Sequence, residues 1–418
     1  MSEPAVAVAS VEANRTRFDG ARVIWLAALV QATGTPLLSA YGVIQTPLIE
    51  EFAADAAQLG IGMGLAILAM ALSALALGPI FDRGPLRTVM LAGVALMFSA
   101  MFALSRGSAL WQLALCLPLV AAGFSMYGMF PAQVMLVNWF VQRRGSALGR
   151  AAVGGSIGAL IVPIAMAALV DAFGWRTALV ALAAGAALLA GPPIALFAVK
   201  RPEDVGQTPD GLPIVPEPMP ARAAHAAPAS EIRGWLRGPN FWAIGLGAGL
   251  ALSVSVATLF LVRHLEKLGI ERTQAALLPS LIAAFGILGK LAAGWAIDRF
   301  DARGVVVTAL WVHALGWAIV ATQSSYAALL VAAAPLGLGG GGFLPLPAVL
   351  QGRCFGRDAI GRVSGLHAML GLPFLVATAP LVGMAEVATG SFRTPFLGLA
   401  GALVVASGVL ACVRAPRD

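Results

Sequence analysis

The sequence predicts an all-α membrane protein in which twelve transmembrane helices form two pseudo-symmetric six-helix bundles. Three observations support this fold class. Of the 418 residues, 59% are hydrophobic and only 11% are charged, which is more apolar surface than the core of a water-soluble protein hides. The apolar residues form continuous runs, most of them close to the roughly 20 residues needed to cross a bilayer. A short charged motif also occurs once in each half of the chain.

The predicted transmembrane segments lie between successive charged residues. The apolar runs cover residues 23–49, 56–81, 88–105, 107–142, 151–170, 177–199, 238–262, 273–289, 304–352, 363–385 and 394–413. The run 304–352 is too long for a single span, and the polar turn QSSY at 323–326 divides it into two. The runs therefore predict twelve helices.

The basic residues predict the orientation of these helices. With the N-terminus placed in the cytoplasm, 19 arginines and lysines fall in cytoplasmic segments. The opposite side then holds only Arg106, Arg176, Arg263, Lys267, Arg272 and Arg393. By the positive-inside rule both termini are cytoplasmic, and we expect a multi-pass protein of a bacterial inner (plasma) membrane. The net charge of +7 reflects this topology, and its spread over short loops argues against a nucleic-acid partner.

The domain organisation follows from a break in the middle of the chain. Residues 200–239 contain eight prolines among charged and small residues, which is typical of a linker. We therefore divide the chain into a cytoplasmic tail (1–22), an N-terminal bundle (23–199), the cytoplasmic linker (200–239), a C-terminal bundle (240–413) and a second tail (414–418). The first 22 residues lack the short apolar stretch of a cleavable signal peptide.

An internal repeat relates the two bundles. GPIFDRGPLR at 78–87 and GWAIDRFDAR at 294–303 end the second helix of each half and are offset by 216 residues. The same offset carries Pro131 onto Pro347. Such a repeat predicts two equivalent bundles around a central pathway, with a binding site near the middle of the membrane.

The repeated stretches resemble the cytoplasmic loop motif G-x-x-x-D-R-x-x-x-R/K of the major facilitator superfamily. The matching residues are Gly78, Asp82, Arg83 and Arg87, and Gly294, Asp298, Arg299 and Arg303. The resemblance implies the major facilitator fold, a transport function by alternating access, and a gating role for these charged residues. The carboxylates are expected to meet helix ends or arginines of neighbouring helices. The alternative is that the charged residues only enforce topology.

A second stretch resembles two smaller groups of transporters. NWFVQRRGSALGRAAVGGSIG at 138–158 is similar to the junction of the fourth and fifth helices in monocarboxylate porters and oxalate/formate antiporters. The resemblance implies an organic anion as substrate. The glycines of this stretch suit helices that slide past each other, and they equally suit helices that pack closely without motion.

Lys290 is the strongest candidate for the substrate anchor. It lies eight residues before Asp298 and so about 12 Å inside the cytoplasmic end of the eighth helix. A charge facing lipid at this depth costs several kcal/mol, so its face, flanked by Gly286 and Gly294, should contact a pathway or another helix. In the carboxylate porters that the chain resembles, a cation four residues before the motif glycine pairs with the substrate carboxylate. Lys290 occupies that position.

Two other interpretations of Lys290 stay open. The lysine pairs with an acidic residue as part of the scaffold, although every aspartate and glutamate near the helices falls at a helix end or in an outer loop. Alternatively the amine is neutral because burial disfavours its charged form.

Departures from the relatives bear on substrate and coupling. Gly286 stands where some carboxylate porters have an aspartate, and no second cation occurs between Arg362 and Arg393, where the oxalate antiporters have one. A single deep cation favours a small monocarboxylate over a dicarboxylate. Exchange of anions, uniport and proton-coupled transport all stay open, and Lys290 and His367 are the candidates for carrying a proton.

Further candidates line the predicted helices. Tyr41, Gln45 and Tyr127 are predicted to contact substrate, with packing of the tyrosines against backbone carbonyls as the alternative. Arg150 either lines the inner vestibule or extends to the cytoplasmic surface.

The remaining features exclude other classes. The three cysteines lack metal-ligand spacing, and we find no metal site, cofactor motif or catalytic combination, so we expect no enzyme. The alternative functions are an exporter of larger lipophilic or drug-like compounds, or a non-transporting receptor or assembly protein on the same fold. The expected partners are a small organic anion, a co-transported proton or counter-anion where transport is coupled, and the lipid bilayer, and we expect no nucleic acid and a functional monomer.

Overall fold

The computed structural model describes residues 18–34, 36–140, 143–211, 234–297, 299–343, 346–355 and 360–413. These residues are almost entirely helical and contain no strand. Ten helical segments among them are long and apolar enough to cross a membrane. Large apolar side chains are exposed on the outside, for example Leu188 at 73% and Leu291 at 68%, and such a surface suits lipid rather than water.

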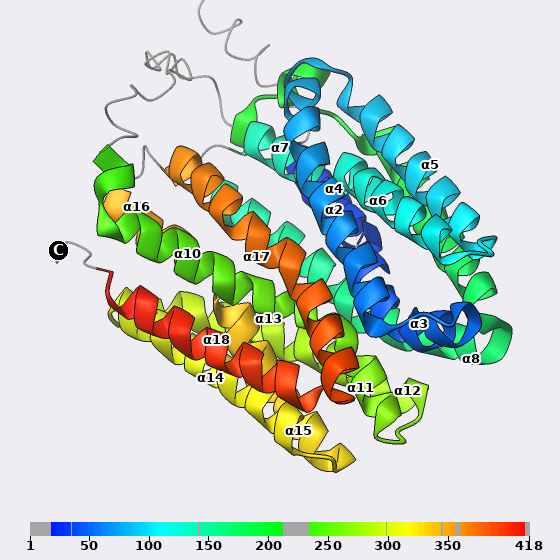
Figure 1. The fold of residues 1–418 in the computed structure, drawn as a ribbon. Helices are drawn as coiled ribbons and strands as arrows, with labels where there is room; N and C mark the ends of the chain where they lie inside the picture. Colours follow the sequence, from blue (N-terminus) through cyan, green and yellow to red (C-terminus); the bar gives the residue numbers. More distant parts are fainter. Residues whose placement is uncertain are drawn as a thin grey trace, which may run out of the picture.

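The first half of the chain forms one bundle (Figure 1). Its helices are α2 (Gly20–Gly34), α3 (Pro36–Phe52), α4 (Ala56–Arg83), α5 (Leu86–Ser105), α6 (Leu110–Tyr127), α7 (Met129–Trp139) and α8 (Arg144–Phe197). Two short turns of 3-10 helix, η1 (Pro202–Val205) and η2 (Pro209–Gly211), follow on the linker side.

The second half forms the other bundle (Figure 1). Its elements are α10 (Pro239–Val254), η3 (Ser255–Phe260), α11 (Leu261–Lys267), α12 (Arg272–Ala275), α13 (Leu277–Ile297), α14 (Ala302–Thr322), α15 (Tyr326–Phe343), α16 (Leu346–Phe355), α17 (Ile360–Thr389) and α18 (Arg393–Ala411). The starts of α2 and α10 and the end of α18 define what we call the near end of the molecule. Helices α3, α11 and α12 lie at the opposite, far end (Figure 1).

The ten segments are consistent with the twelve predicted helices. Helix α8 contains two of them, because Gly174 adopts φ 76° and breaks the regular backbone between the predicted fifth and sixth helices. Glycine takes this left-handed conformation without steric cost. Helices α2 and α3 flank Thr35, which lies outside the described residues, and together they cover the predicted first run, 23–49.

The sequence repeat reappears as a repeated contact. In the first half, Nε of Arg87 donates to the carbonyl of Ala198, 3.2 Å away, just beyond the end of α8. In the second half, Nη1 of Arg303 donates to the carbonyl of Val413, also at 3.2 Å, just beyond the end of α18. A guanidinium is a favourable partner for the carbonyls at a helix C-terminus. Each bundle therefore contains the same internal brace.

Within each bundle the helices approach closely at glycines. A Cβ on Gly154 of α8 would lie only 1.9 Å from the carbonyl oxygen of Ala28 on α2. In the second bundle a Cβ on Gly341, in the glycine-rich stretch of α15, would lie 2.3 Å from the carbonyl oxygen of Gly286 on α13. Small residues allow this approach, and van der Waals packing of backbones then holds helices together in lipid.

Replacing Gly154 by valine should destabilise the first bundle, because the new side chain has no room against α2. Overpacking of this kind costs about 1–3 kcal/mol. Thermal unfolding of the purified protein in detergent should show a lower midpoint for Gly154→Val. Gly185→Ala on the same helix, where nothing lies within 4 Å of an added Cβ, should unfold like the wild type. Equal midpoints for the two variants would contradict this account of the α2–α8 contact.

Candidate functional site

Lys290 lies where the two bundles meet. It is half-buried on α13, and its Nζ donates to Oγ of Ser156 on α8 at 2.9 Å. Ser156 is itself half-buried, and a Cβ on its neighbour Gly155 would lie 3.9 Å from Cβ of Gln31 on α2. The amine thus lies between α13 and α8, and α2 packs next to this part of α8. Among the described residues no carboxylate forms an ion pair with it.

The glycines that flank Lys290 differ in their surroundings. Gly286 faces α15, where an added Cβ would come within 3.8 Å of the carbonyl oxygen of Gly337, whereas nothing lies within 4 Å of a Cβ on Gly294. Space beside the lysine is therefore open at Gly294, on the side towards the near end. At Gly286, on the other side, the helix packs against α15 inside the second bundle.

Tyr41, Gln45 and Tyr127 are all completely or almost completely buried. The Tyr41 hydroxyl donates to the carbonyl of Leu59 at 2.6 Å, and the Tyr127 hydroxyl contacts Sδ of Met97 at 3.4 Å, so both tyrosines bond inside the first bundle. Gln45 instead reaches the other bundle, where its Nε2 donates to the carbonyl of Leu259 in η3 at 3.1 Å. Contact with substrate stays a prediction for all three.

The contacts described for His367 and Arg150 are with residues other than Lys290. His367 on α17 is buried, its Nδ1 is 2.9 Å from the amide nitrogen of Gln351 on α16, and its ring lies 4.6 Å from that of Phe241 on α10. These are contacts inside the second bundle. Arg150 is exposed and bonds back to Ser146, one turn nearer the start of α8, which is the direction of the cytoplasm in the predicted topology. Roles in coupling or in a vestibule stay predictions.

The repeated motif is described only in part. Asp298 and the side chains of Asp82 and Arg83 lie outside the described residues. Arg87 and Arg303 form the braces within each bundle, and Arg299 lies over the ring of Trp295, 4.6 Å from its centroid. The described members of the motif thus contact their own bundle, and a gating role for Asp82, Arg83, Arg87, Asp298, Arg299 and Arg303 stays a prediction.

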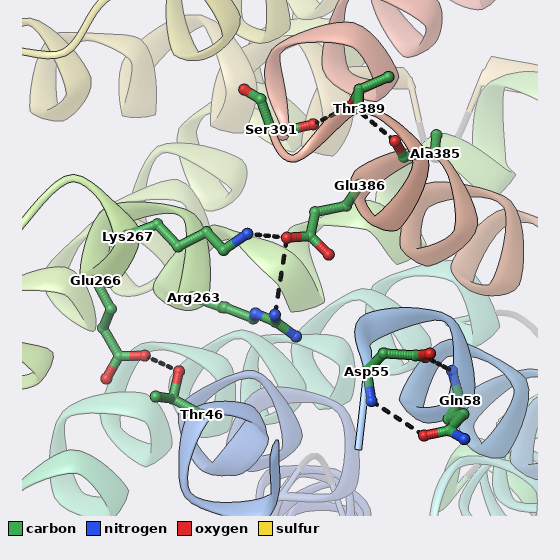
Figure 2. A network of polar contacts seen from close by, with 10 residues as sticks. All are labelled: Thr46, Asp55, Gln58, Arg263, Glu266, Lys267, Ala385, Glu386, Thr389 and Ser391. Carbon is green, nitrogen blue, oxygen red and sulfur yellow. Dashed lines mark hydrogen bonds and ion pairs between the residues drawn. The ribbon is translucent and has the colours of Figure 1, made fainter. Parts of the chain in front are cut away.

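A polar network joins the bundles at the far end. The Thr46 hydroxyl on α3 donates to the Glu266 carboxylate on α11 (Figure 2). Arg272 on α12 donates to the same carboxylate at 2.9 Å and to Oδ1 of Asp171 on α8 at 2.9 Å. Thr273 adds a bond of 2.7 Å to Asp171. Three side chains of the second bundle therefore bind two of the first.

Close backbone contacts between the bundles lie in the same region. A Cβ on Gly42 would lie 2.7 Å from the carbonyl oxygen of Leu259, one on Gly60 2.4 Å from that of Ala379, and one on Gly383 2.2 Å from that of Ala56. These positions all belong to the far halves of their helices. In the near halves, Gly149, Gly294 and Gly365 have nothing within 4 Å of an added Cβ. The structure is thus tightly closed at the far end.

The sequence analysis did not predict that Glu386 is a buried acid. It lies on the last turn of α17 but is only 3% exposed, and its carboxylate bonds to Lys267 and lies 3.8 Å from Nη2 of Arg263 (Figure 2). One signal was present in the sequence, because Arg263 and Lys267 are four residues apart and so share a helix face. At the same end of the first bundle the Arg176 guanidinium holds the pKa of Glu51 below its usual range.

Cysteines at Asp171 and Thr273 should cross-link the bundles, because the two native side chains are in hydrogen-bonding contact. After replacement of Cys116, Cys354 and Cys412 by alanine, an oxidant or a short bifunctional reagent should join the halves. A protease site engineered into 212–233 allows the chain to be cut between the halves. Cross-linked halves then run together on a non-reducing gel, and unlinked halves separate. Cysteines at Asp171 and Gly294, two positions at opposite ends of the molecule, serve as the control pair. Equal linking of both pairs would contradict closure at the far end.

Comparison with known proteins identifies the family of this chain. The family model described as Major Facilitator Superfamily matches residues 24–289 and 244–418. Monocarboxylate transporter 11 of Homo sapiens is 30% identical over 341 residues, which cover 78% of this chain and 67% of that protein. Monocarboxylate transporter 12 of Rattus norvegicus is 27% identical over 311 residues, 67% of this chain and 61% of that protein. The aligned region thus spans about three fifths to two thirds of these relatives.

The fold has close counterparts among solved structures. A bacterial homologue of the human lysosomal transporter Spinster, in an inward-facing and unoccupied conformation, superposes with a TM-score of 0.77 at 15% identity and covers 95% of this chain and 97% of that one. The family match and the helical architecture lead to the same assignment. The chain is a multi-pass membrane protein that belongs to the major facilitator superfamily of transporters and, within it, resembles the monocarboxylate transporters.

Proposed function

We propose that this chain is a secondary active transporter that moves a small organic monocarboxylate across the membrane by alternating access, with the carboxylate held by Lys290. One observation carries the proposal. The Lys290 amine lies at the interface of the bundles, and its partner among the described residues is the neutral hydroxyl of Ser156. The names of the relatives, which are monocarboxylate transporters, agree with this choice of substrate.

The charge of Lys290 explains why the ligand is an anion. An ammonium group inside a membrane protein is costly unless an opposite charge compensates it. A hydroxyl stabilises the ammonium through a hydrogen bond but brings no negative charge. A substrate carboxylate supplies that charge, and one cation matches one carboxylate. The Ser156 hydroxyl lies close enough to donate a second hydrogen bond to the same carboxylate.

Closure at the far end bears on which side of the membrane the site opens to. The positive-inside rule assigns the far end, which holds Arg176, Arg263, Lys267 and Arg272, to the outside of the cell. On this assignment we infer an inward-facing state, in which Lys290 is reached from the cytoplasm of a bacterial cell and both termini lie on that side. Separation of the bundles at the far end would expose Gln45, which now bonds across the interface. The coupled species, a proton or a counter-anion, is left to experiment.

Substitution of Lys290 tests the anchor. In proteoliposomes, a radiolabelled panel of acetate, propionate, lactate and benzoate, with oxalate and succinate for comparison, should show saturable uptake of at least one monocarboxylate. Lys290→Ala should lower this uptake at least about tenfold, because a hydrogen bond to a charged group is lost. Lys290→Arg, which keeps the charge, should retain part of it.

The exposed Arg393 provides a matched control, since Arg393→Ala removes a cation outside the site. Monodisperse elution in detergent establishes that each variant is folded. If Lys290→Ala transports as well as the wild type, the lysine is a scaffold residue. If no carboxylate moves at all, the proposed substrate class is wrong and export of larger compounds has to be tested.

Ser156 allows a second test that leaves the lysine in place. Ser156→Asp puts a carboxylate beside Nζ of Lys290, which should occupy the cation internally and abolish uptake of the monocarboxylate. Ser156→Asn adds a side chain of the same size without charge and should retain more of the uptake. Initial rates at several substrate concentrations separate the two variants. Equal loss in both would show that size, rather than charge, matters at this position.

A further inference from the structure

We propose that Arg263 and Lys267 form a second carboxylate-binding site at the far end, which Glu386 occupies in the closed conformation and the substrate occupies when the bundles separate there. The inference rests on the proposed function, because it takes the same monocarboxylate as ligand. It adds a site that none of the sequence motifs indicates.

The geometry already holds a carboxylate. Arg263 and Lys267 lie one turn apart on one face of α11 and both point to Oε1 of Glu386 (Figure 2). Lys267 bonds to this oxygen, and Nη2 of Arg263 lies 3.8 Å from it. The Glu386 side chain is only 4% exposed. The two cations therefore bind a carboxylate that is almost removed from solvent.

Arg263 keeps a free hydrogen-bond donor in this arrangement. Its side chain is 11% exposed, and its buried Nη1 has no hydrogen-bond partner among the described residues. A guanidinium has five N–H donors in a planar fork that matches the two oxygens of a carboxylate. A buried donor without a partner is costly. A bidentate carboxylate would satisfy Arg263 better than Glu386 does at 3.8 Å.

An aromatic wall completes the site. The buried ring of Phe392 has its centroid 5.5 Å from Nζ of Lys267 and 6.0 Å from Cζ of Arg263. Cations over an aromatic face are stabilised by the ring. The same ring offers an apolar surface for the short chain of a monocarboxylate, so that two cations and an apolar wall match both parts of the ligand.

The neighbouring acids leave room for an added anion. Glu266 lies near Arg263 but is bound to Arg272 and Thr46, and Asp55 caps the start of α4 through the amide of Gln58 at 2.7 Å. Asp55 belongs to the first bundle and moves away with it when the far end opens. Glu386 compensates only one of the two positive charges of Arg263 and Lys267, so the pair still attracts an anion that can displace it.

Glu386 would act as an internal competitor of the substrate. When the substrate carboxylate occupies the cation pair, Glu386 is released at the end of α17, where opening exposes it to water. When the far end closes, Glu386 returns and the substrate is free to pass inwards to Lys290. The exchange lets the pair capture an anion without retaining it.

The test uses the full chain held open at the far end. Gly383→Trp cannot close, because even a Cβ at this position would lie 2.2 Å from the carbonyl oxygen of Ala56, and Gly60→Trp serves in the same way if that variant does not fold. Equilibrium binding of the radiolabelled monocarboxylate transported by the wild type is measured in detergent. Adding Lys290→Ala removes the deep site and leaves the far site alone.

In this open Lys290→Ala background the monocarboxylate should still bind. Arg263→Gln should then weaken its binding about tenfold or more, whereas Arg106→Gln, an exposed cation at the same end, should leave it unchanged. Glu386→Gln should strengthen binding several-fold because the competitor is removed, and Glu271→Gln, an exposed acid, should not.

The outcomes separate the two proposals. Binding in the open background that disappears with Lys290→Ala alone would refute the second site and leave the transport proposal intact. Absence of binding in every variant, together with absence of uptake by the wild type, would refute the proposed function itself. Binding that survives Arg263→Gln unchanged would assign the far site to other residues and overturn the inference.

Discussion

The close approach of helix backbones at glycine is the contact on which the rest of this structure depends. In lipid there is no hydrophobic force between helices, so they associate through packing and hydrogen bonds. Gly154 against α2 and Gly341 against α13 hold each bundle together. Gly60 and Gly383 bring α4 and α17 together at the far end. The same chemistry thus serves both the permanent contacts inside a bundle and the contacts that have to break between bundles.

The difference between these two kinds of contact lies in the polar groups beside them. Inside the bundles, Arg87 and Arg303 bond to backbone carbonyls at helix ends. Between the bundles at the far end, charged side chains bond to each other near water, as Arg272 does to Asp171. Exposed ion pairs contribute little net stability. A contact of small net strength is suited to opening and closing within a transport cycle.

Much of the fold follows from the sequence because hydropathy and the repeat are local signals. The apolar runs place the spans, and the left-handed backbone of Gly174 marks the break between the two spans that α8 contains. The position of Lys290 opposite a helix of the other bundle also agrees with the prediction that its face avoids lipid. Gly286, which the pattern groups with the face of Lys290, packs against α15 of the same bundle.

The far-end cluster could not be predicted for a physical reason. Lys267 and Glu386 are 119 residues apart, and an acid at the end of a helix is normally exposed. In the structure Glu386 is buried, and it contacts Lys267 and Arg263, which come from a distant part of the sequence. The tyrosines show the same limit, since the sequence indicates depth in the membrane but not the direction of a side chain, and Tyr41 turns to Leu59 inside its own bundle.

The two internal braces bear on how such a chain is made. The contact of Arg87 with Ala198 can form before any residue of the second bundle has been synthesised, because both partners precede that bundle in the sequence. The first bundle is therefore able to reach its folded form in the membrane while the ribosome is still adding the second. The second bundle can close its own brace only when Val413 has emerged. The two braces therefore allow the halves to fold one after the other as they are translated.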